Sequence, residues 1–150
     1  MSETAQCLCL ASRRAARAIT GAFDRELRGH GLRATQFTLL AALSLRGEQT
    51  ISELAAFIEA DRTTMTRNVA LATARSLVSV RPADGDRRVR LVSITAAGRD
   101  VLAGALSSWS KVQAAITEQI GIDAADGLRH LAAKRSTRDA LPQLRAQEQL

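Results

Sequence analysis

The sequence predicts a mainly α-helical fold with one small β-hairpin. Apolar residues recur at steps of three and four over most of the chain, which is the spacing of an amphipathic helix. Only two prolines, Pro82 and Pro142, interrupt the 150 residues, so long helices are permitted. Two valine-containing segments, 77–80 and 89–94, flank a turn signal and predict the hairpin. The length is that of one domain.

Two helices are predicted in the N-terminal third. The first covers residues 6–29, and glycines at its end favour termination. The second covers residues 34–46 and stops at Gly47. The apolar face of the first helix comprises Leu8, Ala11, Ala15, Ile19, Phe23 and Leu27, and that of the second comprises Phe37, Leu40 and Leu43.

A pair of short helices follows. Thr50 and Glu53 fit a capping box, in which each side chain accepts from the other residue's backbone amide. They predict a helix over residues 51–59, with Leu54, Ala55 and Ile58 facing inward. Asp61 is the expected N-cap of the next helix, residues 62–76. Two short helices separated by a few residues indicate a helix-turn-helix, although many such pairs do not touch DNA.

The hairpin directly after this pair sharpens the prediction. Asp84 and Gly85 supply the turn, since glycine tolerates a positive φ. Residues 81–88, between the predicted strands, are rich in arginine. A hairpin that follows a helix-turn-helix is a wing, so the predicted architecture is a winged helix-turn-helix with a basic wing tip.

Two further helices are predicted after the wing. Thr95 is expected to cap a long helix over residues 95–120. Asp123 is expected to cap a last helix, with Ala125, Leu128 and Leu131 facing inward. The apolar stripe of the long helix comprises Leu102, Leu106, Trp109, Ile116 and Ile120.

Positive charge is concentrated around the second short helix and the hairpin. The formal net charge of the chain is +6, and seven arginines but only three acids lie between Asp61 and Arg90. A concentrated basic patch is typical of nucleic-acid binding. Arginine suits phosphate and guanine because its planar group donates two hydrogen bonds at once. Arginine from a GC-rich genome is the alternative explanation of the composition.

These features together resemble the MarR family of bacterial winged-helix regulators over nearly the whole chain. The most specific part is Asp86-x-Arg88 in the wing, followed by Thr95-x-x-Gly98. The matching residues are Leu32, Thr35-Gln36-Phe37, Ile51-Ser52-Glu53-Leu54-Ala55, Asp61-Arg62-Thr63-Thr64-Met65-Thr66-Arg67, Asp84-Gly85-Asp86-Arg87-Arg88 and Ile94-Thr95-Ala96-Ala97-Gly98.

The resemblance implies a single domain, residues 1–150, that forms a homodimer. Residues 32–98 would be the DNA-binding lobe, and residues 1–31 and 99–150 the dimerisation helices. It also implies repression or activation at a pseudo-palindromic operator, often relieved by a small molecule or an oxidant; a repressor is the expected form. Two departures from the family are Ser76, where a glycine is usual, and the polar last helix, with Arg135 and Arg138 in place of apolar dimer contacts.

Helix 62–76 is the predicted recognition helix, because an α-helix fits the major groove and its N-terminal residues reach base edges. The base-contact candidates are Thr63, Thr64, Thr66 and Arg67, whereas Arg62 and Arg75 are expected to meet phosphates. The resemblance suggests that Arg88 enters the minor groove, whose negative potential attracts arginine, and that Asp86 braces it by an ion pair. Arg87 and Arg90 are expected to add backbone contacts.

Cys7 and Cys9 leave two interpretations open. One branch of the family senses organic peroxides through a cysteine in register with Cys9, but this chain has Phe23 and Ala34 where that branch has tyrosines. A thiol near positive charge or a helix N-terminus is reactive, and Arg13 lies one turn on. Packing in a dimer core is the other interpretation.

The resemblance makes a small aromatic effector equally possible, whereas two cysteines without further ligands disfavour a metal.

Several other classes are disfavoured. No apolar stretch reaches the ~18 residues of a membrane span, and the acidic N-terminus does not fit a secretory signal. Two cysteines close together do not form the disulfide framework of a secreted protein, so a reducing, cytoplasmic location is expected. No phosphate loop, nucleophile motif or metal cluster indicates an enzyme or a cofactor. RNA binding would favour more than 3% aromatic residues. The remaining alternative is a winged-helix protein-interaction module without DNA binding.

Overall fold

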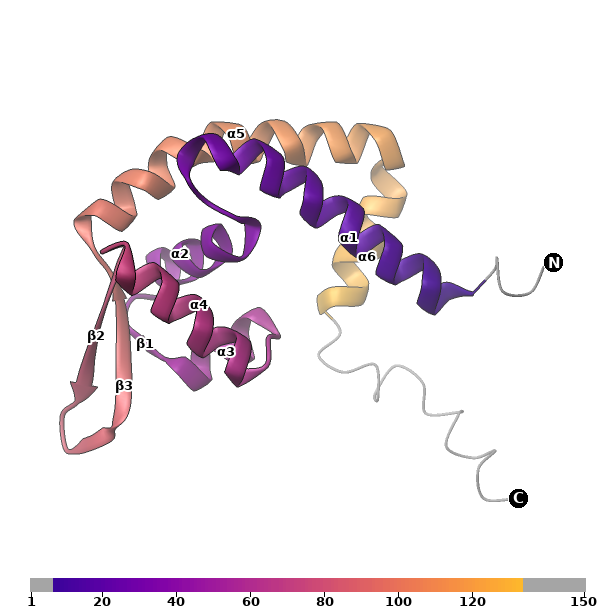
Figure 1. Cartoon of the computed structure of the whole chain (residues 1–150). Helices are drawn as coiled ribbons and strands as arrows, with labels where there is room; N and C mark the ends of the chain where they lie inside the picture. The colour runs from indigo at the N-terminus through magenta and orange to yellow at the C-terminus, as the bar shows by residue number, and fades with distance from the viewer. Residues whose placement is uncertain (1–6, 134–150) are drawn as a thin grey trace, which may run out of the picture. The chain divides into compact units, whose positions relative to one another are not determined.

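The computed structural model describes residues 7–133, in which the mainly helical fold with a small antiparallel sheet is confirmed (Figure 1). The chain divides into two units, Met1–Val112 and Gln113–Leu150, and the division falls within the longest helix. The elements are α1 (Leu8–Leu27), the short 3₁₀ turn η2 (Arg28–His30), α2 (Ala34–Arg46), β1 (Gln49–Thr50), α3 (Ile51–Ile58), α4 (Arg62–Ala74), β2 (Val78–Ala83), β3 (Asp86–Ile94), α5 (Ala96–Ile120) and α6 (Ile122–Ala133).

The sheet has the order β1-β3-β2, with all pairs antiparallel. Val78 pairs with Ile94 at the base of the hairpin, and Figure 1 shows β2 and β3 extending away from the helices. The predicted hairpin is confirmed, but its strands reach almost to the turn, and a register shift at Pro82/Ala83 accommodates the proline. Strand β1 was not predicted, because two residues carry no periodic signal.

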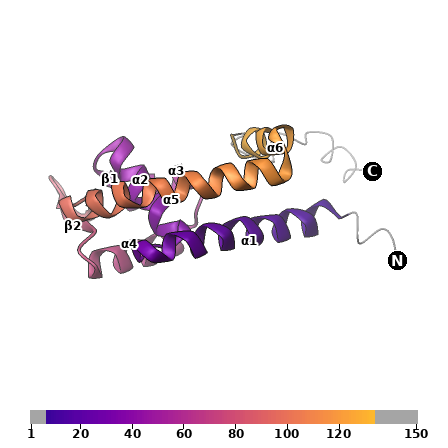
Figure 2. The ribbon, with the colours of Figure 1, turned by 90° about the horizontal axis from the view of Figure 1, so that it is seen from above.

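The core of the first unit lies between α2, α3, α4 and the sheet. Leu40, Leu54, Met65 and Val92 are at most 1% exposed. Trp109 of α5 extends this core, because its ring stacks on Phe37 at a centroid distance of 5.9 Å. It also lies 6.5 Å from the ring of Phe23, where α1 runs beside α5 (Figure 2). Burial of such rings is a main source of stability.

The predicted helix caps are largely confirmed. The Glu53 amide donates to Thr50 Oγ1 at 3.1 Å, and the Thr50 amide donates to Glu53 Oε2 at 2.7 Å. The Thr64 amide donates to Asp61 Oδ1 at 2.8 Å. The start of α2 has a cap that the sequence did not reveal. There the Ala34 amide donates to Asp24 Oδ1 at 2.7 Å, ten residues back along the chain.

The motif Thr95-x-x-Gly98 has a structural explanation. The Thr95 hydroxyl accepts from the Gly98 amide at 3.0 Å and lies 2.7 Å from the Ser76 carbonyl oxygen, to which it donates. A Cβ on Gly98 would clash with the backbone carbonyl of Leu77. The motif therefore fixes α5 against the end of α4 and the start of β2. Ser76 adopts φ 56°, the left-handed conformation for which glycine is best suited.

Some predictions of inward-facing residues are wrong for the single chain. Leu128 and Leu131 of α6 are 43% and 53% exposed, and Leu106 of α5 is 49% exposed. The periodic pattern identifies an apolar helix face, and within residues 7–133 no other segment buries these three side chains. Asp123 is the second residue of α6 rather than its N-cap. Arg135 and Arg138 lie outside the described residues, among which no helix is long and apolar enough to cross a membrane.

Candidate DNA-binding surface

Helix α4 presents a polar face because its other face is held in the core. Met65, Val69 and Ala72 recur at steps of four and three and are buried. This arrangement turns the predicted contact residues outward, and Arg62, Thr63, Thr64, Thr66 and Arg67 are all exposed. The predicted recognition helix thus has the orientation that groove binding requires.

Two of the threonine hydroxyls already donate within the helix. Thr64 Oγ1 donates to Asp61 Oδ2, and Thr66 Oγ1 donates to the Arg62 carbonyl at 2.8 Å. A phosphate oxygen only accepts hydrogen bonds, so these hydroxyls are better suited to accepting from a base amino group. Their methyl groups remain free for a thymine methyl.

The Asp61 cap is an ionised carboxylate. Hydrogen bonds from the Thr64 side chain and then from its amide lower the pKa of Asp61 below its ordinary value. Glu53 behaves similarly, because the Thr50 amide and then the Thr50 hydroxyl lower its pKa. Both negative charges lie at helix N-termini, where the helix dipole favours them.

The wing brings three of its predicted arginines to an exposed hairpin. Arg87 and Arg88 follow the turn at Gly85, which adopts φ 89°, and Arg90 pairs across the ladder with Pro82. The expected ion pair between Asp86 and Arg88 is not formed. Instead Asp86 Oδ1 accepts from the backbone amide of Arg88 at 2.9 Å. A short carboxylate side chain reaches the amide two residues on more readily than a guanidinium, as in other Asx turns.

Two arginines of the basic segment have partners inside the chain. Arg81 holds Glu48 through two hydrogen bonds, from Nη2 at 2.6 Å and from Nε at 3.0 Å, which fastens the wing to the turn before β1. Arg75, expected to meet phosphates, donates from Nη1 to the carbonyl of Gly31. Sequence spacing did not reveal these contacts, since they join residues 33 and 44 positions apart.

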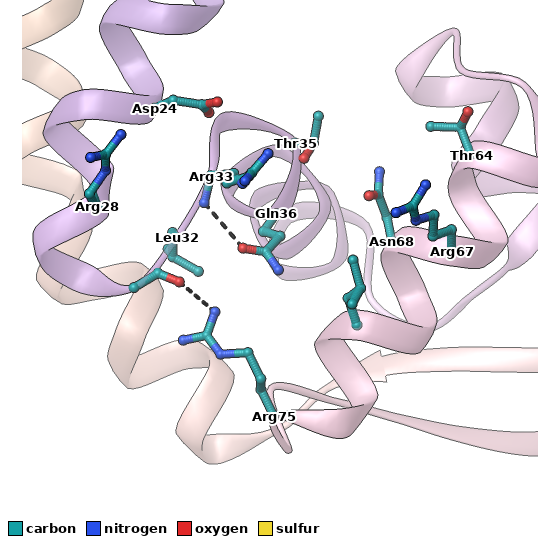
Figure 3. A pocket seen from close by; sticks show the side chains of 12 residues that line it. Asp24, Arg28, Leu32, Arg33, Thr35, Gln36, Thr64, Arg67, Asn68 and Arg75 are labelled. Atoms are coloured by element: carbon teal, nitrogen blue, oxygen red, sulfur yellow. Dashed lines mark hydrogen bonds between the residues drawn. The ribbon is translucent and has the colours of Figure 1, made fainter.

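A basic hollow opens beside α4, with a cavity volume of about 1030 Å³ (Figure 3). Its walls are the end of α1, the turn into α2 and the outward face of α4. The residues that line it are Asp24, Arg28, Gly31, Leu32, Arg33, Thr35, Gln36, Thr64, Arg67, Asn68, Leu71 and Arg75. Arg28 and Arg33 were not predicted as site residues, because two separate cations near a turn look like a solvated surface in sequence.

Both cysteines are exposed and free in the single chain. Cys7 immediately precedes α1, and Cys9 lies in its first turn. The carbonyl of Cys9 accepts from the Ser12 hydroxyl at 3.0 Å. Neither thiol is packed against the rest of the described chain.

Comparisons with known proteins agree with this geometry. The family model described as MarR family matches residues 30–89. A search of curated proteins finds no significant match. The M. tuberculosis transcriptional regulator MosR, solved in complex with DNA, is 41% identical, with a TM-score of 0.78 over 90% of this chain and 98% of that chain.

Two other solved structures are similar. The transcriptional repressor CouR, bound to a 23-mer DNA duplex, is 25% identical, with a TM-score of 0.78 over 89% of this chain and 94% of that chain. A MarR variant from E. coli, complexed with operator DNA, is 20% identical, with a TM-score of 0.75 over 85% of this chain and 91% of that chain. At this identity the likeness supports the fold alone. The chain we describe belongs to the MarR family of transcriptional regulators.

Proposed function

We propose that this protein is a cytoplasmic, sequence-specific DNA-binding repressor that acts as a homodimer on a pseudo-palindromic operator. The observation that carries the proposal is one lobe with two exposed basic elements, the outward face of α4 and the β2–β3 wing. MosR and CouR, each solved with DNA, support the DNA partner, and CouR is itself named a repressor.

The two elements have different tasks on the duplex. Helix α4 lies in the major groove, where Arg67 donates to a guanine and Thr63 contacts a neighbouring base or phosphate. Arg88 enters the adjacent minor groove, while Arg87 and Arg90 bind phosphates along its edge. Reading by Arg67 supplies sequence preference, and the wing supplies affinity that is less dependent on sequence.

A second copy of the chain covers apolar side chains that are exposed on α1, α5 and α6 in the described residues. They include Leu8 of α1, Leu106 of α5 and, in the second unit, Ile122, Leu128 and Leu131. Several large exposed apolar residues on neighbouring turns of a helix are typical of an interface. A symmetric pair presents two recognition helices to two half-sites. Sedimentation equilibrium should give twice the chain mass of 16.1 kDa, and a stable single chain would contradict the dimer.

The signal that releases DNA is either a small aromatic acid or oxidation of Cys9. In the second case a peroxide transfers one oxygen to the Cys9 thiolate, which forms a sulfenic acid as the O–O bond breaks and an alcohol or water leaves. The exposure of the thiol supports this access. Cys9→Ser should bind DNA normally and resist release by peroxide. Wild-type protein that peroxide never releases would disprove oxidation as the signal.

The decisive experiment uses a duplex selected from a random pool by the wild-type protein, compared with a scrambled duplex in gel-shift titrations. Arg67→Ala should cost ~1–3 kcal/mol on the selected duplex and little on the scrambled one. Arg88→Ala should weaken both. Arg99→Ala, an exposed arginine on α5, is the control. A protein-interaction module would instead show no steep salt dependence and no effect of either variant.

A further inference from the structure

The basic hollow beside α4 lies at the edge of the predicted DNA-contacting face. Thr64 and Arg67 belong both to that face and to the lining of the hollow. A duplex placed against these two side chains therefore lies at the mouth of the hollow. The opposite wall belongs to different elements, the end of α1 and the start of α2 (Figure 3).

The charges that line the hollow favour an anion. Arg28, Arg33, Arg67 and Arg75 face a single acid, Asp24, so the formal net charge of the lining is +3. The Asp24 carboxylate is already engaged by the Ala34 amide. One N–H group of Arg75 donates to the Gly31 carbonyl. Within residues 7–133, the side chains of Arg28 and Arg33 form no hydrogen bond or ion pair.

The dimensions of B-DNA favour a DNA phosphate as this anion. The major groove is ~12 Å wide, and a helix with its side chains is ~10–12 Å across, so a helix in the groove fills it from wall to wall. The phosphodiester backbones then pass close to both flanks of the helix. The hollow occupies the flank of α4 that faces α2. A backbone on this flank passes within reach of long arginine side chains at its rim.

We propose that the basic hollow holds a stretch of the DNA phosphodiester backbone, with Arg33 and Arg28 as its phosphate-binding residues. The proposal rests on the proposed function and extends it, because the interface then includes η2 and the turn into α2 in addition to α4 and the wing. Bidentate arginine is well matched to phosphate oxygens. Since phosphate contacts carry no base information, these residues raise affinity on every sequence.

The test uses the full-length protein and the duplex that it selects. Arg33→Gln and Arg28→Gln are compared with Arg25→Gln, which removes the same charge from the exposed surface of α1 outside the hollow. Each lost phosphate contact should reduce the slope of log Kd against log salt by about 0.9. Kd should rise several-fold on selected and scrambled duplexes alike, and the control should keep the wild-type slope. Melting temperatures identify any variant that fails to fold.

Duplexes with single neutral methylphosphonates locate the contact directly. Wild-type protein should lose affinity when the phosphate at Arg33 is neutralised, and Arg33→Gln should be insensitive to that same replacement. Two results together would overturn the proposal: a wild-type salt slope for both Arg33→Gln and Arg28→Gln, and no methylphosphonate position at which either variant differs from the wild type. DNA binding by α4 and the wing would remain supported in that case. If inorganic phosphate stabilises the free wild-type protein but not Arg33→Gln, and the DNA slope is unchanged, the hollow takes a free anion instead. Failure of the wild-type protein to bind any duplex would reject the proposed function itself.

Discussion

The guanidinium of Arg75 donates a hydrogen bond from Nη1 to the backbone carbonyl of Gly31, and so joins the end of α4 to the turn between α1 and α2. Gly31 adopts φ 67°, and a Cβ there would lie 2.8 Å from Arg75 Nη2. The missing side chain is what lets the guanidinium approach the backbone. The placement of the end of α4 therefore depends on a contact outside the helix-turn-helix.

Arg75→Met should separate this structural role from a phosphate contact. Methionine keeps the apolar stem and loses the donors, so we expect the free energy of unfolding to fall by about 1 kcal/mol. The salt slope of DNA binding should stay near the wild-type value. Arg62→Met on the same helix is the matched comparison, with unchanged stability and a slope reduced by about 0.9. Urea unfolding and salt titrations measure both quantities, and the reverse pattern would make Arg75 the phosphate ligand.

Ser76→Gly should stabilise the protein. Ser76 adopts φ 56°. This conformation is about 1 kcal/mol unfavourable for an L-residue with a side chain, whereas glycine adopts it freely. The expected gain in thermal or urea unfolding is about 0.5–1 kcal/mol after the entropy of the unfolded glycine is subtracted. Ser44→Gly, at an exposed position inside α2, should lose a similar amount. Destabilisation by both changes would mean that Ser76 is not strained.

The parts of the fold that could be predicted are those with a local signal. The capping box at Thr50 and Glu53, the cap at Asp61 and the turn at Gly85 each depend on residues within three positions, and the structure contains all of them. Apolar periodicity likewise predicted the helix bounds to within about two residues at most ends. Ser76 could be recognised because the resemblance expects glycine there, and the structure shows why.

The remaining features depend on contacts between distant residues. The cap that Asp24 provides to α2 and the pairing of Glu48 with Arg81 have no signature in local sequence. The basic hollow is assembled from three elements, so its arginines at 28 and 33 looked like ordinary surface charge. Inward faces were predicted correctly for α2 and α3 but not for Leu128, because periodicity identifies an apolar face without identifying the partner that covers it.

Acid should destabilise the protein partly through its helix caps. The pKa of Asp61 is lowered in the folded chain, so its ionised form favours folding above the pKa of the unfolded chain. This contribution is lost as the pH falls through the lowered folded value, and the free energy of unfolding should decline below pH ~4. Asp61→Asn keeps an acceptor for the Thr64 amide but cannot titrate. Urea unfolding from neutral to acidic pH should show a shallower acid decline for this variant, and identical declines would exclude Asp61 as a contributor.

Asp86 should act on DNA binding through the shape of the wing rather than through its charge. Its Oδ1 accepts from the Arg88 amide at 2.9 Å, which fixes the backbone from which the Arg88 side chain projects. Asp86→Asn retains a carbonyl acceptor at the same reach, whereas Asp86→Ala leaves the amide to solvent and loosens the turn. We expect the alanine variant to lose several-fold in affinity on selected and scrambled duplexes, as Arg88→Ala does, and the asparagine variant to stay near the wild type.

A double-variant cycle makes this mechanism testable. If Asp86 works only by positioning Arg88, then Asp86→Ala should cost little in an Arg88→Ala background, because the side chain that it positions is gone. Losses that simply add would assign Asp86 a separate role. Weakening by Asp86→Asn equal to that by alanine would show that the negative charge matters, as the ion pair predicted from sequence would require. The hydrogen bond in the structure favours the first outcome, since it uses the carboxylate as an acceptor for the backbone and leaves the Arg88 side chain exposed.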